Sequence, residues 1–275
     1  MTASDRFADL RPRVITSVVI ATIAVAAIWL GGLWTTALVT LAVALMCVEF
    51  SAVTEGRRLD IYSGATLWAL PAAALPITFL FLTIPQGAVL IGFLVVLTTV
   101  VDLLAGRRKG VIARILGVGW ITGVGLSFIW IRHFPEWGLL STAWIALVVA
   151  ATDIGAYFAG RLIGGPKLWP ALSPKKTWAG LGGGVALAFL VGGLFSWATT
   201  GTYFLQVCTV SSIAALLAQG GDLAESALKR RYGAKDAGTL LPGHGGVLDR
   251  CDGLLAATFV AALLTNWRGQ AVFIW

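Results

Sequence analysis

Nine continuous apolar segments, each about 20 residues long, follow one another along this chain of 275 residues. About 20 apolar residues in an α-helix span the hydrocarbon core of a bilayer, and continuous apolar runs indicate helices rather than barrel strands. Only 12% of the residues are charged, against about 25% in soluble domains. The sequence therefore predicts an all-α, polytopic membrane protein with about nine transmembrane helices, at residues 14–30, 33–53, 62–83, 87–104, 111–131, 138–160, 180–199, 203–223 and 253–272.

The distribution of Lys and Arg predicts how these helices are oriented. With nine helices, all but Arg132 and Arg268 of the 20 cationic residues lie on one side of the membrane, in the N-terminal segment, in every second link or, for Arg114, at the start of a helix on that side. Cytoplasmic links are enriched in Lys and Arg, so we expect a cytoplasmic N-terminus and an outside C-terminus, in the cell's inner membrane. The net charge of +7 is then a matter of orientation and of attraction to anionic lipid, and does not indicate nucleic-acid binding.

No linker or internal repeat divides the chain. We expect one membrane-embedded domain, residues 1–275, in which residues 1–135 supply N-terminal helices and residues 136–275 supply the catalytic helices and cytoplasmic loops. The three cysteines show no metal-binding spacing, so we expect free thiols.

The acidic residues indicate where the chemistry lies. All 13 except Glu136 fall on the predicted cytoplasmic side or at the cytoplasmic ends of helices. A transporter of anionic solutes, the alternative from another functional class, would more often carry its key charges near the membrane midplane. The distribution favours a site at one interface, where a water-soluble reagent meets a lipid headgroup.

Two clusters precede the most polar part of the chain. Asp153, Tyr157 and Arg161 have helical spacing and form one polar stripe, which suits either an active site or a structural Asp–Arg network. In residues 164–184, glycines and prolines predict irregular backbone, and Lys175 and Lys176 lie among them. Lysines beside exposed backbone N–H groups suit phosphate, although an ordinary cytoplasmic loop has the same composition.

The third cluster lies between the last two predicted helices. Asp222, Glu225, Ser226 and Lys229 line one helix face, and Asp249 and Asp252 share a face at the start of the last helix. Helix N-termini favour anions, so the two aspartates could simply cap that helix. With Asp222 they would instead form an oxygen-rich site for Mg²⁺, which binds through few carboxylates plus substrate phosphates.

This third cluster resembles the signature of the phosphatidate cytidylyltransferases, also called CDP-diacylglycerol synthases. The matching positions are Ser226, Leu228, Lys229, Arg230, Lys235, Asp236, Gly238, Leu241, Pro242, His244, Gly245, Gly246, Asp249, Arg250 and Asp252. The segments "DIGAYFAGR" and "SPKKTW" are similar to other blocks of the family, in the same order, so the resemblance covers about residues 145–255. Ala179 departs from the pattern, because the family usually has Glu there.

The resemblance implies that the protein transfers the cytidylyl group of CTP to phosphatidic acid, giving CDP-diacylglycerol and pyrophosphate. It implies Mg²⁺ held by Asp222, Asp249 and Asp252, with Lys229 as a further catalytic residue, and on the resemblance alone a monovalent cation such as K⁺ and a homodimer. The expected substrate-binding residues are Asp153, Lys175, Lys176, Ser226, Arg230, Lys235, Asp236, His244, Gly245, Gly246 and Arg250. The phosphate nucleophile is already ionised, so no general base is needed and catalysis rests on positioning and charge neutralisation.

Two other classes of lipid enzyme match the sequence less well. A CDP-alcohol phosphotransferase needs an Arg where "DGLLAA" has Ala257, and the second half of that motif is missing. A CTP-dependent polyprenol or phytol kinase is closer in chemistry, but the run from Pro242 to Asp252 favours the cytidylyltransferase.

Overall fold

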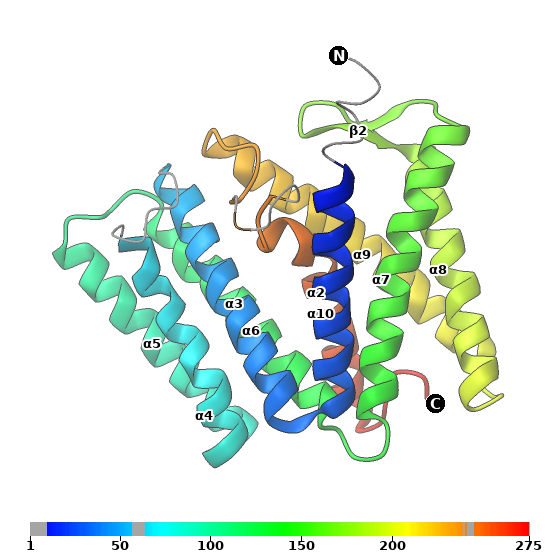
Figure 1. Ribbon diagram of the computed structural model, residues 1–275, viewed down its shortest axis with the longest axis horizontal. Helices are drawn as coiled ribbons and strands as arrows, with labels where there is room; N and C mark the ends of the chain where they lie inside the picture. The colour runs from blue at the N-terminus through cyan, green and yellow to red at the C-terminus, as the bar shows by residue number, and fades with distance from the viewer. Residues whose placement is uncertain (1–9, 57–63, 239, 241–244, 275) are drawn as a thin grey trace. The chain divides into compact units, whose positions relative to one another are not determined.

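The computed structural model describes residues 10–56, 64–238, 240 and 245–274 and is drawn in Figure 1. Within these residues the protein is mostly helical, as predicted, with one small sheet. Two compact units are present: Met1–Ile129 with Arg231–Arg250, and Trp130–Arg230 with Cys251–Trp275. The loop that the sequence assigned to the C-terminal half therefore groups with the N-terminal helices.

Six helices in the described part are long and apolar enough to cross a membrane, which agrees with a multi-pass membrane protein. They are α3 (Gly32–Glu55), α5 (Ile84–Leu104), α6 (Val111–Arg132), α7 (Gly138–Leu162), α8 (Trp178–Thr199) and α9 (Phe204–Arg231). Shorter apolar helical stretches cover Val18–Leu30, within α2 (Leu10–Leu30), and Ala65–Phe81. The helix α10 (Leu248–Arg268) lies at the ninth predicted segment but is not among the six.

The third predicted segment is not a regular α-helix. Residues Gly64–Ala73 form a 3₁₀ helix, η1, and only Ala74–Phe81 form an α-helix, α4. Pro71 lies inside η1, where it lacks a backbone N–H and its ring crowds the preceding turn, so a standard α-helix cannot run through it. The uniform α-helix expected over residues 62–83 was therefore wrong in its first half.

The first unit contains a buried charged network near the ends of α3, α5 and α6. The Arg114 guanidinium is fully buried; it pairs with Asp102 at 2.9 Å and with Glu55 at 3.7 Å. It also donates to the carbonyl oxygens of Lys109 and Arg107, while Trp68 Nε1 donates to Asp102 at 2.9 Å. Because a buried charge is tolerated only when it is paired and hydrogen-bonded, this network ties the three helices together at one end.

The second unit is organised around α7 and α8, which pack against each other along their length (Figure 1). Glycines permit the close approach: a Cβ on Gly183 would lie 2.8 Å from the Gly155 carbonyl oxygen, and one on Gly180 would lie 3.0 Å from that of Ala156. Small residues at such contacts are typical of helix pairs in membranes. This pairing fixes the spacing between the polar stripe of α7 and the segment that precedes α8.

That preceding segment is regular, contrary to the prediction for residues 164–184. The strands β1 (Lys167–Trp169) and β2 (Ser173–Thr177) pair antiparallel, and α8 begins at Trp178, with the Thr177 hydroxyl accepting the Gly180 N–H at 3.0 Å. Pro174 is tolerated because a two-stranded sheet has only edge strands, in which a missing N–H can face away from the ladder. The hairpin holds Lys175 and Lys176 on a defined strand rather than on an irregular loop.

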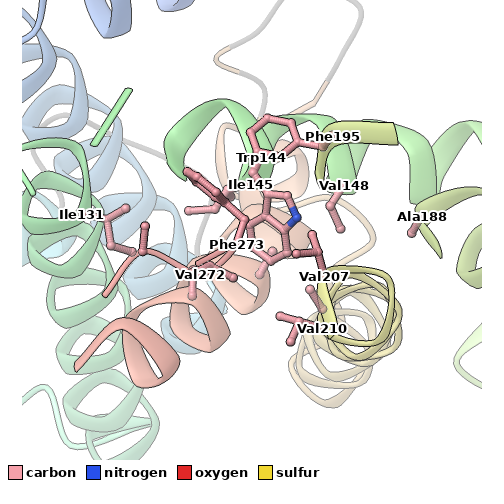
Figure 2. Packing of buried hydrophobic residues seen from close by; sticks show 14 of the residues in the cluster. Ile131, Trp144, Ile145, Val148, Ala188, Phe195, Val207, Val210, Val272 and Phe273 are labelled. Carbon is pink, nitrogen blue, oxygen red and sulfur yellow. The ribbon is translucent and has the colours of Figure 1, made fainter. Parts of the chain in front are cut away.

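The core of the second unit lies among the end of α6, the helices α7, α8, α9 and α10, and the C-terminal segment (Figure 2). Trp144 and Phe273 are fully buried in it, and the indole N–H of Trp144 donates to the Ser211 hydroxyl at 3.1 Å. Helices in a membrane associate through close van der Waals packing and interhelical hydrogen bonds of this kind, since burial there removes no apolar surface from water. This buried cluster holds together the helices whose ends carry the polar residues.

Candidate active site

Three carboxylates meet where α9 and α10 carry their polar residues. Asp222 and Glu225 lie one turn apart on α9, and Asp252 lies in the first turns of α10. One oxygen from each carboxylate lies within 4.8 Å of the other two. The predicted pair Asp222 and Asp252 is therefore brought together, and Glu225 joins it.

The electrostatics of this trio centre on Asp252, which precedes the last predicted membrane segment. Burial, and then the negative charge of Asp222, raise the pKa of Asp252 from 3.8 to about 6. Its Oδ1 accepts the Gly253 N–H at 2.7 Å, which works in the opposite direction. The neighbouring carboxylate that adds to the effect of burial here would also favour a cation bound between the two groups.

Two lysines pair with the trio rather than stand apart from it. Lys176 Nζ lies 2.5 Å from Asp222 Oδ2 and also donates to the Gln219 carbonyl oxygen at 3.3 Å. Lys229 Nζ lies 3.2 Å from Glu225 Oε2, with both side chains about nine-tenths buried. Both lysines thus hold carboxylates in place in addition to any role toward a substrate.

A cavity of about 410 Å³ opens beside Asp222 and Asp252 within the second unit. The α7 stripe forms one wall, and the Arg161 guanidinium donates to the Tyr157 hydroxyl at 2.6 Å. The cavity is lined by Asp153, Ala156, Tyr157, Gly160, Arg161, Lys175, Lys176, Thr177, Gly180, Leu181, Ala218, Gln219, Asp222, Asp252 and Gly253. Both polar clusters that the sequence placed on α7 and before α8 therefore face the same cavity as the aspartates.

Asp249, in the first turn of α10, binds backbone N–H groups of the preceding loop, which belongs to the first unit. Its carboxylate accepts the Ala237 N–H at 3.0 and 3.1 Å and the Gly246 N–H at 2.9 Å. Both donors precede α10 in the chain, so Asp249 holds the preceding loop instead of capping the N–H groups of the helix itself, and it is not in the carboxylate trio. Its assignment as a metal ligand stays a prediction.

The other predicted site residues have separate positions. Ser226 lies near the trio, its hydroxyl 3.4 Å from Asp222 Oδ1. Gly246 is buried and Gly245 has a φ of 86°. Arg230, Lys235, Asp236 and Arg250 are exposed, and His244 lies outside the described residues.

Two functional candidates were missed in the sequence. Glu225 was placed on the Asp222 face but given no role, although its spacing from Asp222 was the available signal. Glu49 is fully buried in α3, and its carboxylate accepts the N–H groups of Val247 at 3.0 Å and Leu248 at 2.8 Å. A glutamate in an apolar segment was its signal, but the sequence does not say what it contacts.

The trio fits a divalent cation by the chemistry of its donors. Carboxylate oxygens are the hard ligands that Mg²⁺ prefers, and Mg²⁺ usually needs only one or two of them plus substrate phosphates. The Asp222 side chain is 42% exposed, so its site can be reached from the cavity. Asp222, Glu225 and Asp252 are the residues that would hold the ion.

Fold and site together define a multi-pass membrane protein with a polar cavity that pairs carboxylates with cationic side chains. A sequence model of the cytidylyltransferase family matches residues 11–267, almost the whole chain. The chain therefore belongs to the cytidylyltransferase family.

Curated relatives carry a more specific name. The chain is 39% identical over 258 residues to the phosphatidate cytidylyltransferase of Brucella suis, covering 94% of this chain and 92% of that protein. It is 42% identical over 129 residues to the Bacillus subtilis enzyme of the same name, covering 46% of this chain and 48% of the other. The enzyme of that name from Helicobacter pylori is 39% identical over 162 residues, 58% of each chain.

Proposed function

We propose that this protein transfers the cytidylyl group of CTP to phosphatidate, giving CDP-diacylglycerol and pyrophosphate for phospholipid biosynthesis. The observation that carries the proposal is one cavity in which Asp222 and Asp252 face Lys175, Lys176 and Arg161. A site that joins two phosphate-bearing substrates needs cationic groups for the phosphates and carboxylates for a metal ion. The substrates are inferred from the family and from the name of its relatives, phosphatidate cytidylyltransferase.

The proposed reaction requires no proton transfer by a protein side chain. A phosphate oxygen of phosphatidate forms a bond to the α-phosphorus of CTP while the bond to the bridging oxygen of the β-phosphate breaks, and pyrophosphate leaves. The nucleophile is ionised near pH 7, because the second pKa of a phosphomonoester is about 6. The residues therefore orient the reactants and offset charge, which is how most phosphoryl-type transfers are accelerated.

Each group in the cavity has a place in this scheme. Arg161 and Lys175 lie on the cavity wall as phosphate-binding groups. Lys176 and Lys229 hold Asp222 and Glu225 at short range, which fixes the carboxylate trio. Bound Mg²⁺ would supply positive charge against the phosphates. A monovalent cation such as K⁺ beside it is part of the proposal through family resemblance.

The proposal includes the membrane arrangement. Nine crossings with a cytoplasmic N-terminus, an outside C-terminus and an inner-membrane location are supported by the one-sided distribution of Lys and Arg. The cavity residues Lys175 and Lys176 then face the cytoplasm, where CTP is available. Reporter fusions at the two termini test this arrangement: opposite sides are expected, and the same side would contradict it. A homodimer, proposed from resemblance, is tested by native mass spectrometry.

The reaction is tested by following a phosphorus label from CTP into the products. Purified protein in detergent is given phosphatidate, Mg²⁺ and CTP labelled at either the α- or the γ-phosphorus. We expect the α label in the lipid and the γ label in pyrophosphate, both only when phosphatidate is present. A CTP-dependent lipid kinase would place the γ label in the lipid, and a transporter would give no product. Asp252→Asn serves as the inactive control and Glu136→Gln as the matched charge change outside the cavity.

A further inference from the structure

Glu49 is a buried carboxylate on a membrane helix that no step of the proposed reaction uses. It lies in the last two turns of α3, one of the six candidate membrane helices, and it is fully buried. A carboxylate in such a place is costly unless it is hydrogen-bonded, and it is more often functional than incidental. Its contacts are therefore informative.

Those contacts are with the start of α10, almost 200 residues away in sequence. Glu49 Oε1 accepts the N–H of Val247 and Oε2 accepts the N–H of Leu248, the first residue of α10. The first N–H groups of a helix have no partner within it, and a negative charge there is favoured by the helix dipole. Glu49 thus caps α10 from another helix, a task that a residue adjacent in sequence usually performs.

The loop is shaped to admit this carboxylate. A Cβ on Gly238 would lie 2.5 Å from Glu49 Oε1, and a Cβ on Gly246 would lie 2.7 Å from Oε2. Real Cβ atoms do not approach oxygen this closely, so a side chain at either position would push the carboxylate away from its present place. Both belong to the motif that the sequence singled out, and their absent side chains have a physical reason here.

Asp249 binds the same loop from its other side. It accepts the N–H groups of Ala237 and Gly246. Together the two carboxylates fix four backbone N–H groups, at Ala237, Gly246, Val247 and Leu248. The segments 235–238 and 245–247 are therefore anchored by Glu49 from α3 and by Asp249 from α10.

We propose that Glu49 is a positioning residue, which sets the placement of the segments 235–238 and 245–247 and of the first turns of α10 through its two backbone hydrogen bonds and the contacts with Gly238 and Gly246. It touches no reacting atom. It acts because Asp249 and Asp252 lie in the first turns of the helix whose start it holds. The catalytic part of this inference rests on the proposed function, whereas the placement of the loop does not.

The test compares two isosteric changes on the same helix. Glu49→Gln keeps the size of the side chain but turns an amide N–H₂ toward one of the two backbone N–H groups, so at least one hydrogen bond is lost. Glu55→Gln is the matched control, because Glu55 lies on the same helix and pairs with Arg114. Gly238→Ala disrupts the same contact through a change in the loop. It replaces Glu49→Gln as the test variant if Glu49→Gln does not fold.

Two readouts separate this inference from the proposed reaction. The first is the kcat and the Mg²⁺ concentration for half-maximal activity; residues that support a metal site typically change such values 10–100-fold. The second is the rate at which a maleimide modifies the partly exposed Cys251, which needs no activity; Cys47 and Cys208 are fully buried. We expect Glu49→Gln and Gly238→Ala to lower kcat at least about tenfold, to raise the Mg²⁺ requirement and to speed Cys251 modification. The double variant is expected to be little worse than either single variant.

Glu55→Gln is expected to lower the unfolding temperature while leaving the Mg²⁺ requirement and the Cys251 rate near their wild-type values. The inference is overturned if Glu49→Gln and Gly238→Ala leave the Cys251 rate unchanged, or if Glu55→Gln changes both readouts as much at an equal loss of stability. If the labelling changes as expected but no variant, wild type included, makes CDP-diacylglycerol, the proposed reaction fails and the anchoring of the loop stands.

Discussion

The glycine contact between α7 and α8 allows a quantitative prediction. A methyl group on Gly183 would lie 2.8 Å from the Gly155 carbonyl oxygen and closer still to the Ala159 Cβ, whereas one on Gly182 meets nothing within 4 Å. Replacing Gly by Ala within a helix contributes about 1 kcal/mol of stability through backbone entropy, and this gain is common to both positions. The difference between Gly183→Ala and Gly182→Ala therefore isolates the cost of overpacking, about 1–3 kcal/mol.

The measurement is the thermal unfolding midpoint of both variants in one detergent, followed by tryptophan fluorescence. At about 2–4 °C per kcal/mol, Gly183→Ala should unfold about 2–12 °C below Gly182→Ala. Gly183→Ala should also lose more activity, because α7 and the hairpin before α8 form two walls of the cavity. Equal midpoints, or a higher midpoint for Gly183→Ala, would show that the close glycine contact does not set the spacing of these helices.

The remaining predictions concern the site. Asp222→Asn and Asp252→Asn should each lower kcat at least about 100-fold with the fold retained, while Glu136→Gln keeps normal turnover; wild-type pyrophosphate release by both aspartate variants would refute the metal assignment. Because the pKa of Asp252 is raised to about 6, protons compete with the cation below that pH, so the Mg²⁺ requirement should rise about tenfold per pH unit below 6 and be flat above 7. A requirement that is flat down to pH 5 would contradict this. His244→Gln should lose some activity yet keep the shape of the pH–rate profile, and the loss of one limb would identify a general base. In membrane vesicles, an impermeant maleimide should modify Cys251 only from the cytoplasmic face and more slowly with CTP and Mg²⁺; modification from the outer face would contradict the nine-helix topology.

Periodicity and composition were sufficient for most of the fold. Long apolar runs predicted helices because lipid leaves the backbone few alternatives, and each predicted segment has a helix in the structure. The errors occurred where local chemistry competes with that rule. Pro71 sits in a 3₁₀ stretch within an otherwise apolar run, and the glycines after Thr177 lie inside α8, because packing against α7 favours small residues there.

The site was predictable wherever its residues are close in sequence or share a helix face. The stripe of Asp153, Tyr157 and Arg161 follows from helical spacing alone, and it lines the cavity. Asp249 and Asp252 are also one helical turn apart, but Asp249 turns to loop N–H groups that sequence spacing cannot reveal. The contacts of Glu49 could not be predicted for the same reason, since its hydrogen bonds join residues 198 and 199 positions apart in the sequence.

The charge balance of the cavity explains why lysines and aspartates were found side by side. Asp153, Asp222 and Asp252 line it together with Arg161, Lys175 and Lys176, so its formal charges cancel. Mutual pairing, as between Lys176 and Asp222, keeps these partly buried groups from standing uncompensated before substrate arrives. A triphosphate and a phosphomonoester bring a large excess of negative charge into a space of this kind. A lysine that turns to phosphate leaves its carboxylate behind, and that carboxylate is then best compensated by a cation from solution. We therefore expect a site built from ion pairs to link the binding of polyanions to the binding of a metal ion, whereas a purely cationic pocket would hold the phosphates without one.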